Sequence, residues 1–361
     1  MKTTRKLLIA AAVQFFLQPV FAAEVYEFYD GTRELGMGGA AVATVNDETA
    51  LIANPAALAK LRSSYITVID PEMDGSTNDL AIMNKAGGDS VAFTDAQKLL
   101  GWLAQSPDKY FHATGQVFPS FVVPNFGIGL HAKYRYNAEI VSATNTYDVN
   151  YVNDYALVLG FSARLFDGRI KIGFNGRLVD RVEVVKSLPA GSTGLRWEDL
   201  AAEGVGLASD VGLIITAPWK WLPTLAGVLR DAGTTQFEMN DGFVYQTNVR
   251  PQYVKQTVDV GISVSPVLGN KTRMQISGEY RDVLTSGDET DQARRIHAGL
   301  EVNFGDVFFL RGGMNQRYWT AGFEFAINLF QFQVASYGEE IGTADVNRED
   351  RRYIGKMAIR F

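Results

Sequence analysis

The sequence contains no cysteine and only three histidines in its 361 residues. The lack of cysteine excludes disulfide bonds, thiol catalysis and thiolate metal sites. His112, His131 and His297 are far apart, so no pair of them has the spacing of metal ligands. No Gly-x-Ser-x-Gly elbow of a serine hydrolase occurs either. We therefore expect a protein that is not an enzyme and that has no metal or cofactor.

Two further absences concern membranes and nucleic acids. Beyond residue 22 no run of eighteen apolar residues occurs, which excludes membrane-spanning helices. No dense block of lysine and arginine occurs, and the formal charge is -6, so nucleic acid is excluded as a partner. Any insertion into a membrane must therefore use a closed β-sheet, since only helices and closed sheets satisfy every backbone polar group in hydrocarbon.

The first 22 residues have the pattern of a cleavable signal peptide. Three positive charges precede an apolar stretch over 7–21, and the small residue Ala22 ends this stretch where signal peptidase would cut. Polar residues and Pro19 interrupt the stretch, so an uncleaved anchor helix is the weaker alternative. Cleavage after Ala22 removes three positive charges and no acidic ones, which moves the formal charge from -6 to -9. The mature chain is therefore acidic and exported.

Alternation of apolar and polar residues with a period of two dominates the rest of the chain. In 296–304, for example, Ile296, Leu300 and Val302 alternate with His297 and Glu301. Such a segment gives one face that is compatible with lipid and one polar face, as in the strands of a membrane barrel. The fourteen segments counted in this way are 63–70, 115–123, 125–138, 152–165, 169–183, 205–217, 224–236, 253–267, 271–283, 293–304, 306–314, 317–328, 330–338 and 351–361.

The connections between these segments alternate in length. Short turns such as Pro124, Phe166-Asp167-Gly168 and Gly305 separate longer polar stretches, and only Asn315-Gln316 is a tight turn on the long-loop side. Membrane barrels have short periplasmic turns, longer outer loops and an even number of strands. The sequence therefore predicts an all-β protein, a membrane-spanning antiparallel β-barrel of about 14 strands over 63–361.

A soluble β-sandwich is the competing fold, because its strands alternate in the same way. Its core would have to hide many charges, which is costly unless each is paired or neutralised. We therefore favour the barrel. The charges in question are Arg177, Asp210, Asp259, Arg273, Glu279, Glu301, Glu324, Lys356 and Arg360.

The last strand ends the chain on an aromatic residue. Tyr353 and Phe361 lie on its apolar face, and this pattern resembles the C-terminal signal that the outer-membrane barrel assembly machinery reads. The alternative is an ordinary edge strand that happens to end in Phe. Trp219 and Trp221, in a short turn, suit the aromatic girdle at the periplasmic interface.

Residues 23–62 differ from the rest, because they contain small residues and short helical pieces in place of alternation. We expect them to form a hatch inside the barrel, since a fourteen-stranded barrel is wider than its own side chains can fill. The run Gly36-Met37-Gly38-Gly39 and the later Asn54-Pro55-Ala56 resemble the N-terminal hatch of the FadL superfamily of outer-membrane proteins, which includes transporters of long-chain fatty acids and aromatic hydrocarbons. PorV-type secretion proteins and TraF-type barrels begin with similar N-terminal sequences.

This resemblance implies a passive route for hydrophobic molecules, with release sideways into the membrane through a distorted third strand. It implies that Gly36, Gly38, Gly39 and the triplet Asn54, Pro55 and Ala56 line the ligand pocket. The predicted lateral opening is at Pro124, Gly127 and Gly129, because proline and glycine weaken a ladder. Simple turn chemistry around Pro124 is the alternative.

The stretch 71–114 is expected to be a long outer loop that carries a helix. Thr94 and Gln97 form a capping-box pattern, and Phe93, Ala96, Leu100 and Leu103 follow helical spacing. We interpret this amphipathic helix as a lid on the barrel mouth, with a ligand-receiving platform as the alternative.

The sequence thus predicts uptake of hydrophobic small molecules, such as long-chain fatty acids, by a plugged barrel among outer-membrane lipids. The alternative is a non-conducting barrel, PorV-like or TraF-like, that binds a partner in a secretion or conjugal-transfer apparatus.

Overall fold

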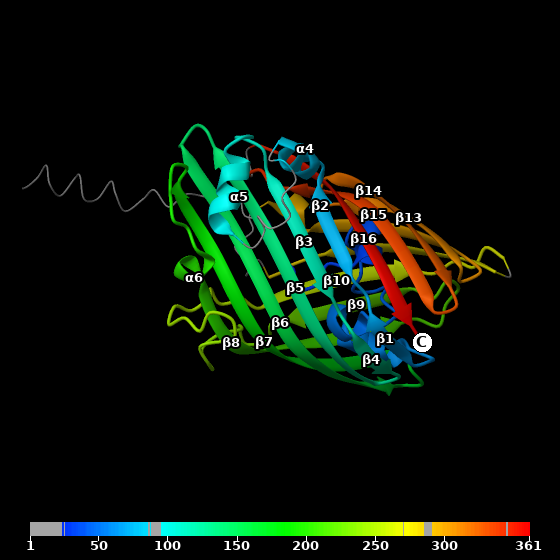
Figure 1. Ribbon diagram of the computed structural model, residues 1–361. Coiled ribbons are helices and arrows are strands. Elements are labelled where there is room, and N and C mark those ends of the chain that lie inside the picture. The colour runs from blue at the N-terminus through cyan, green and yellow to red at the C-terminus, as the bar shows by residue number, and fades with distance from the viewer. Residues whose placement is uncertain are drawn as a thin grey trace, which may run out of the picture.

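The chain forms a closed antiparallel β-barrel in a computed structural model (Figure 1). The structure describes residues 24, 26–85, 87, 95–269, 271–284, 291–343 and 346–361, so the predicted signal peptide at 1–22 lies outside the described residues. Within the described ranges, no helix combines the length and apolarity needed to cross a membrane.

The described residues form sixteen strand segments in one sheet, and these make fourteen strands because two strands are interrupted. β1 and β2 are halves of the first strand, and β3 and β4 are halves of the second. The ring closes where β1 pairs with β16. The segments are β1 (Tyr65–Ile69), β2 (Glu72–Ser76), β3 (Phe111–Val117), β4 (Ser120–Val123), β5 (Phe126–Val141), β6 (Thr146–Leu165), β7 (Ile170–Pro189), β8 (Ala202–Thr216), β9 (Thr224–Arg230), β10 (Thr257–Val264), β11 (Thr272–Tyr280), β12 (Ile296–Phe304), β13 (Phe308–Asn315), β14 (Tyr318–Ile327), β15 (Phe330–Glu340) and β16 (Glu349–Arg360).

The predicted fourteen-stranded barrel is confirmed, and each predicted segment overlaps one observed strand. The strands differ in length around the ring: β5 to β8 have 15 to 20 residues, whereas β9 to β14 have 7 to 10. We call the end with turns such as Phe166-Asp167-Gly168 the short-turn end, and the opposite end the long-loop end.

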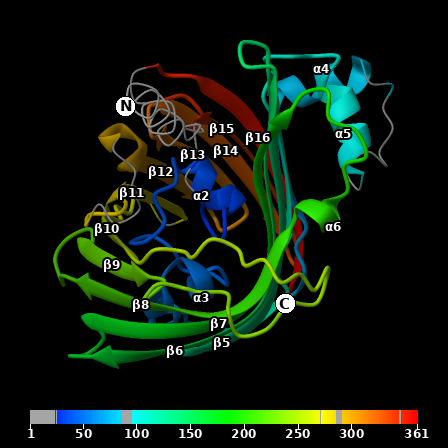
Figure 2. The same ribbon diagram turned by 90° about the vertical axis from the view of Figure 1, so that its left-hand side faces the viewer.

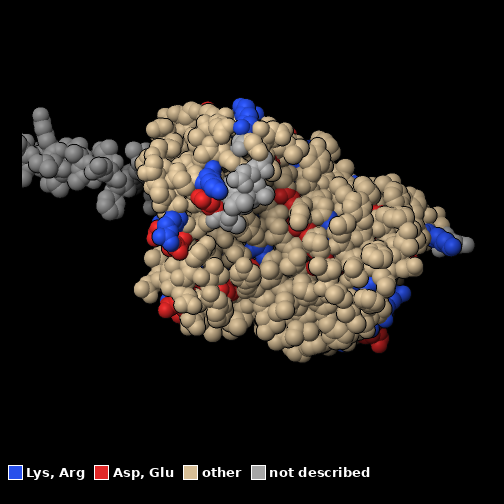
Figure 3. Space-filling view, viewed as in Figure 1, with Lys and Arg blue, Asp and Glu red and all other residues tan. Residues whose placement is uncertain are grey.

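The two faces of the wall have opposite chemistry. Outward side chains such as Phe161, Leu213 and Phe323 are apolar and exposed, and Figure 3 shows one face on which most atoms belong to uncharged residues, with small charged patches between them. Most of the charges predicted to point inward are buried and paired, as in the ion pair of Arg177 with Asp210 at 2.8 Å. Arg273 is different, because it is exposed beside Asp306 at the short-turn end.

Three short helices lie inside the ring: α2 (Thr32–Gly36), α3 (Ala50–Ala53) and the 3-10 helix η1 (Pro55–Lys60). Figure 2 looks into the long-loop end and shows α2 and α3 within the wall. We call residues 24–62 the hatch. Glu24 lies near the long-loop end, where it pairs with Arg352, and the hatch then runs through the lumen to β1 at the short-turn end.

Another three helices lie on the outside of the wall: α4 (Thr77–Lys85), α5 (Ala96–Leu103) and α6 (Trp197–Leu200), which we call the outer-face helices (Figure 2). They share an apolar cluster with outward residues near the long-loop ends of β3 and β5 to β7. This cluster includes Leu99, Leu103, Tyr136, Tyr147, Tyr151, Val182, Val184 and Trp197.

The predicted helix is therefore present, but its predicted position as a lid over the mouth is wrong. Its N-cap is Asp95, whose side chain accepts hydrogen bonds from the backbone N–H groups of Gln97 and Lys98. Thr94 and Phe93 lie outside the described residues. The loop is also shorter than predicted, because β2 extends to Ser76 and β3 begins at Phe111.

The chain ends at the seam of the barrel. Phe361 and Ile66 exchange two backbone hydrogen bonds of 2.9 Å, and the side chains of Tyr353 and Phe361 are exposed on the outward face. Trp219 and Trp221 are exposed in a turn at the short-turn end, where the aromatic girdle was predicted.

A lipid-facing wall makes the cost of a charge depend on depth. We expect Phe323→Arg, halfway along β14, to cost about 2–4 kcal/mol of unfolding free energy, and Ile327→Arg at the end of that strand to cost about 0–1 kcal/mol. Denaturant unfolding in lipid vesicles measures both values. Equal costs would argue against lipid around this wall.

Candidate functional site

The Gly36-Met37-Gly38-Gly39 run packs its backbone directly against the wall. Gly38 and Gly39 have positive φ angles of 67° and 82°, which disfavour residues with a Cβ. On the wall opposite, Gly299 of β12 pairs with Gly313 of β13. A Cβ on Gly299 would lie 2.2 Å from the carbonyl oxygen of Met37, so the hatch fits only because these wall residues are glycines.

Asn54-Pro55-Ala56 packs against a second pair of wall glycines. We call each such pair, Gly299 with Gly313 and Gly173 with Gly212, a glycine seat. Gly173 of β7 pairs with Gly212 of β8, and a Cβ on either would lie 2.1–2.3 Å from hatch atoms. The Asn54 side chain is fully buried, donates to the carbonyl oxygen of Val42 at 2.9 Å and accepts from the N–H of Ala56 at 3.1 Å. It thereby caps η1 and ties two parts of the hatch together.

Polar groups of the wall hold the hatch between these seats. One carboxylate oxygen of Glu279 accepts from the N–H groups of Ala41 and Val42, both at 2.8 Å. Arg33 of the hatch forms a two-pronged ion pair with Glu301 at 3.0 Å. The predicted hatch residues thus pack closely against the wall, and their role in lining a ligand pocket stays a prediction.

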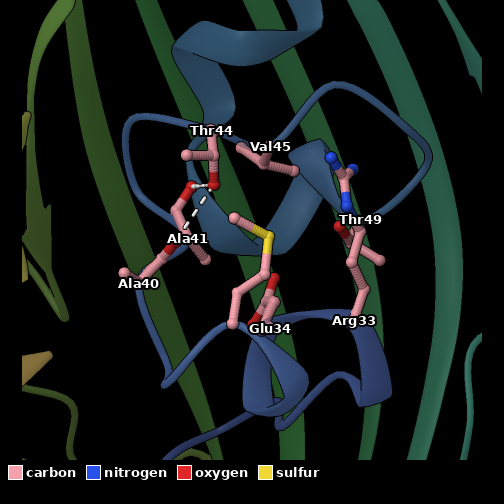
Figure 4. A pocket seen from close by; sticks show the side chains of 8 residues that line it. Arg33, Glu34, Ala40, Ala41, Thr44, Val45 and Thr49 are labelled. Carbon is pink, nitrogen blue, oxygen red and sulfur yellow. Dashed lines mark hydrogen bonds between the residues drawn. The ribbon is translucent and has the colours of Figure 1, made fainter. Parts of the chain in front are cut away.

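The hatch encloses a hollow of only about 10 Å³, lined by Arg33, Glu34, Met37, Ala40, Ala41, Thr44, Val45 and Thr49 (Figure 4). This is space for one water molecule at most. One carboxylate oxygen of Glu34 is buried there without a hydrogen-bond partner among the described residues. Burial, with Asp47 adding repulsion, raises the pKa of Glu34 to about 8, so this carboxyl is protonated at neutral pH.

The wall is interrupted at the first and second strands. The register of β1 against β16 shifts between Thr67 and Ile69, which is a bulge of one residue. β1 then breaks from β2 at Asp70-Pro71, and β3 breaks from β4 at Phe118-Pro119. In place of a ladder bond, the N–H of Phe118 donates to the Asp70 carboxylate at 2.6 Å.

The predicted bulge in the third strand is absent. β5 pairs with β6 without a register shift over its whole length, including Gly127 and Gly129. Instead, the missing Cβ of Gly127 leaves room for Leu51 of the hatch, and that of Gly129 leaves room for the ring of Phe118. Pro124 belongs to the short turn before β5, so the alternative interpretation of turn chemistry describes it better.

Beside the interruption, the wall carries a groove of about 270 Å³. Its lining includes Met73, which is 72% exposed, and Tyr155, which is 47% exposed, so it opens on the outward, lipid-facing side. A Cβ on Gly115 would meet nothing within 4 Å, which shows open space above this residue. The lining residues are Pro71, Glu72, Met73, Gly115, Gln116, Val117, Ala132, Lys133, Tyr134, Asn153 and Tyr155.

The wall residues of this groove also hold the first part of the hatch, from the lumen side. Glu72 accepts from the Tyr29 hydroxyl at 2.6 Å, and Lys133 forms an ion pair of 2.5 Å with Asp30. The side chain of Gln116 donates to the Asp30 carbonyl oxygen at 2.5 Å. A single thickness of wall therefore separates the groove from the hatch segment around Tyr29 and Asp30.

Sequence reasoning missed the groove and the role of the first hatch residues. The sequence showed that Pro119 interrupts the second strand, and Pro71 was the corresponding signal in the first. The bulge, however, depends on how β1 pairs with β16, which lie at opposite ends of the barrel sequence. Among the residues that the structure describes, no three His, Asp or Glu side chains are placed to hold a metal ion.

The sequence matches no protein-family model, and no curated protein matches it. Solved barrels are similar in fold. The CymD monoaromatic hydrocarbon channel aligns with a TM-score of 0.55 at 9% identity, over 91% of this chain and 96% of its own. The Ralstonia pickettii toluene transporter TbuX gives 0.53 at 11%, over 92% and 98%. A Pseudomonas aeruginosa FadL homologue gives 0.52 at 10%, over 94% and 99%.

The glycine seats predict that hatch packing is sensitive to one added side chain. We expect Gly173→Val to displace the segment at Pro55 and Ala56, costing about 1–3 kcal/mol and making the hatch accessible to protease. Limited proteolysis and thermal unfolding measure this. Gly176→Val is the matched control on the same strand, because its Cβ would meet only Phe174, at 3.9 Å. Equal protection of the two variants would contradict the seat.

The raised pKa of Glu34 predicts a pH-dependent hatch. Above the usual pKa of 4.5, the unfolded chain releases a proton that the folded hatch retains up to about 8. Hatch stability should therefore fall as pH rises through this window, by up to about 1.4 kcal/mol per pH unit. Glu34→Gln should remove this dependence, which hydrogen exchange of residues 32–53 at pH 6 and 8 would measure. The same pH dependence in both proteins would contradict the assignment.

Proposed function

We propose that this chain, which has the fold of the FadL-like outer-membrane barrels, takes up hydrophobic small molecules across the outer membrane. Long-chain fatty acids and small aromatic compounds are the ligands we have in view. The observation that carries the proposal is the lipid-facing groove at the wall interruption, separated by one wall thickness from the first part of the hatch.

The chemistry of the groove supports release into the membrane. Its exposed lining is apolar, and it lies on the face where Leu130 and Leu157 are also exposed. A hydrophobic molecule that reaches it gains by moving into hydrocarbon and never enters the water beyond the short-turn end. The glycine seats hold residues 37–39 and 54–56 tightly against the wall. Passage out of the short-turn end would therefore require breaking these contacts, whereas release through the groove would not.

The similar solved barrels support the same class of ligand. Two of them are described as a monoaromatic hydrocarbon channel and a toluene transporter. We infer from the fold and the alternating loops that the short-turn end faces the periplasm and the long-loop end faces outward. The predicted signal peptide and the exposed Phe361 fit export and barrel assembly.

A non-conducting barrel that serves a secretion or transfer apparatus is the second candidate. The observation in its favour is the close packing of the hatch against the wall, where the hatch encloses a hollow of only about 10 Å³. In that case the barrel would bind a protein partner at its long-loop end and take up nothing.

Filling the groove separates these functions. We expect Gly115→Leu to reduce uptake of radiolabelled fatty acid into proteoliposomes at least fivefold, because its side chain enters open space above β3 without displacing neighbours. Gly312→Leu is the matched control, since its Cβ would meet only one backbone oxygen, at 3.7 Å, on the far side of the ring.

Uptake by the wild-type barrel and by Gly312→Leu, with loss in Gly115→Leu, supports release through the groove. Uptake that is unchanged in Gly115→Leu would refute this route. No uptake by the wild type, together with copurification of a secretion protein, would favour the second candidate.

A further inference from the structure

The first hatch residues place acidic and aromatic side chains in the lumen near the long-loop end, where these face cations of the wall. Glu24 pairs with Arg352 at 2.8 Å and with Arg135 at 3.5 Å, and Asp30 pairs with Lys133. We call residues 24 and 26–30 the inner segment. Glu27 pairs with the half-buried Arg281, just beyond β11, at 2.9 Å. The charged contacts of the inner segment thus join its carboxylates to cations of the wall or of its strand ends.

The aromatic rings of the inner segment also lie against cations. The Tyr26 ring centre is 4.6 Å from the Arg135 guanidinium, 4.4 Å from that of Arg181 and 5.4 Å from the Lys133 ammonium. The Phe28 ring lies 4.5 Å from the Arg177 guanidinium. Cations within about 6 Å of a ring centre are attracted to its face, and more strongly when both are removed from water.

Two of these cations depend on the inner segment for their ion pairs. Arg177 and Arg181 have carboxylates of the wall or its loops as well, because Arg177 pairs with Asp210 and Arg181 with Asp154. For Lys133 and Arg135, the inner segment supplies every ion-pair partner found among the described residues. Both side chains are almost completely buried in β5, and Lys133 also lines the groove.

A buried cation without a counter-ion is costly, so the inner segment cannot leave this site empty. Water or an uncharged hydrocarbon would leave Lys133 and Arg135 unpaired. A carboxylate attached to an aromatic ring would restore both kinds of contact, with its charge in the place of Asp30 or Glu24 and its ring in the place of Tyr26.

We propose that the inner segment is an internal stand-in for the ligand, and that the site formed by Lys133, Arg135 and Arg181 takes aromatic carboxylates in exchange for it. This inference rests on the proposed uptake function and narrows its ligand class. The same site discriminates against uncharged aromatic molecules of equal size, because these cannot neutralise the charges of Lys133 and Arg135 on β5.

Binding of a matched acid and alcohol tests this inference on the full-length barrel in detergent. The probes are 4-phenylbutyrate and 4-phenylbutan-1-ol, measured by titration calorimetry. Glu24→Gln combined with Asp30→Asn removes the competing carboxylates, so the acid should bind this variant at least tenfold more tightly than the wild type. The alcohol should bind both proteins equally and more weakly than the acid.

Two further variants keep the test decisive. Adding Lys133→Met and Arg135→Met to the double variant removes the cations as well, and should abolish the preference for the acid. Tyr26→Ala keeps every charge pair and vacates the ring position, so it should also bind the acid more tightly than the wild type does.

Equal affinities for acid and alcohol would overturn the inference, and so would a preference for the acid that survives loss of both cations. An acid that binds no variant more tightly than the wild type would do the same. None of these results would alter the loss of uptake expected for Gly115→Leu, so this inference and the proposed uptake can fail separately.

Discussion

Hydrocarbon offers no hydrogen-bond partners, and this constraint shapes the whole molecule. The sheet must close on itself, which it does where β1 meets β16 and where Ile66 and Phe361 exchange backbone hydrogen bonds. Closure with fourteen strands makes a ring too wide for its own side chains to fill. The hatch fills that width, and it approaches the wall closely enough to require glycine on both sides at Gly38 and Gly299.

The wall interruption is a local exception to that constraint, and its backbone groups are satisfied in other ways. Pro71 and Pro119 have no N–H to pair. Asp70 accepts the N–H of Phe118, which would otherwise be orphaned in the wall. The interruption is compatible with surrounding hydrocarbon because these backbone groups need no hydrogen-bond partner from the lipid.

The sequence was sufficient to predict the barrel, because side-chain direction in a strand follows from the period of two alone. Segment 296–304 illustrates this: its polar residues His297 and Glu301 lie inside, in contact with Gly38 and Arg33 of the hatch. Other local patterns predicted the helices: the lack of alternation indicated the short helical pieces of the hatch, and helical spacing indicated the helix that the structure places at Ala96–Leu103.

Features that depend on distant partners could not be read in the same way. Gly127 and Gly129 were predicted to weaken the pairing of their strand. In the folded barrel they instead make room for Leu51 and Phe118, which the sequence alone does not place beside them. The capping pattern favoured Thr94, whereas Asp95 caps α5. The alternation of polar and apolar residues predicted that Arg177 and Lys356 face inward. It gave no indication of which carboxylates pair with them.

The unequal length of the strands has a consequence for the outward face of the barrel. Strands β5 to β8 project well beyond the rest, and the outer-face helices pad their exterior just above the groove at Tyr134 and Tyr155. These helices bury outward residues such as Tyr136, Tyr147 and Val182, so at this end of β5 to β7 the outward face consists of helix and side chains in place of bare strand.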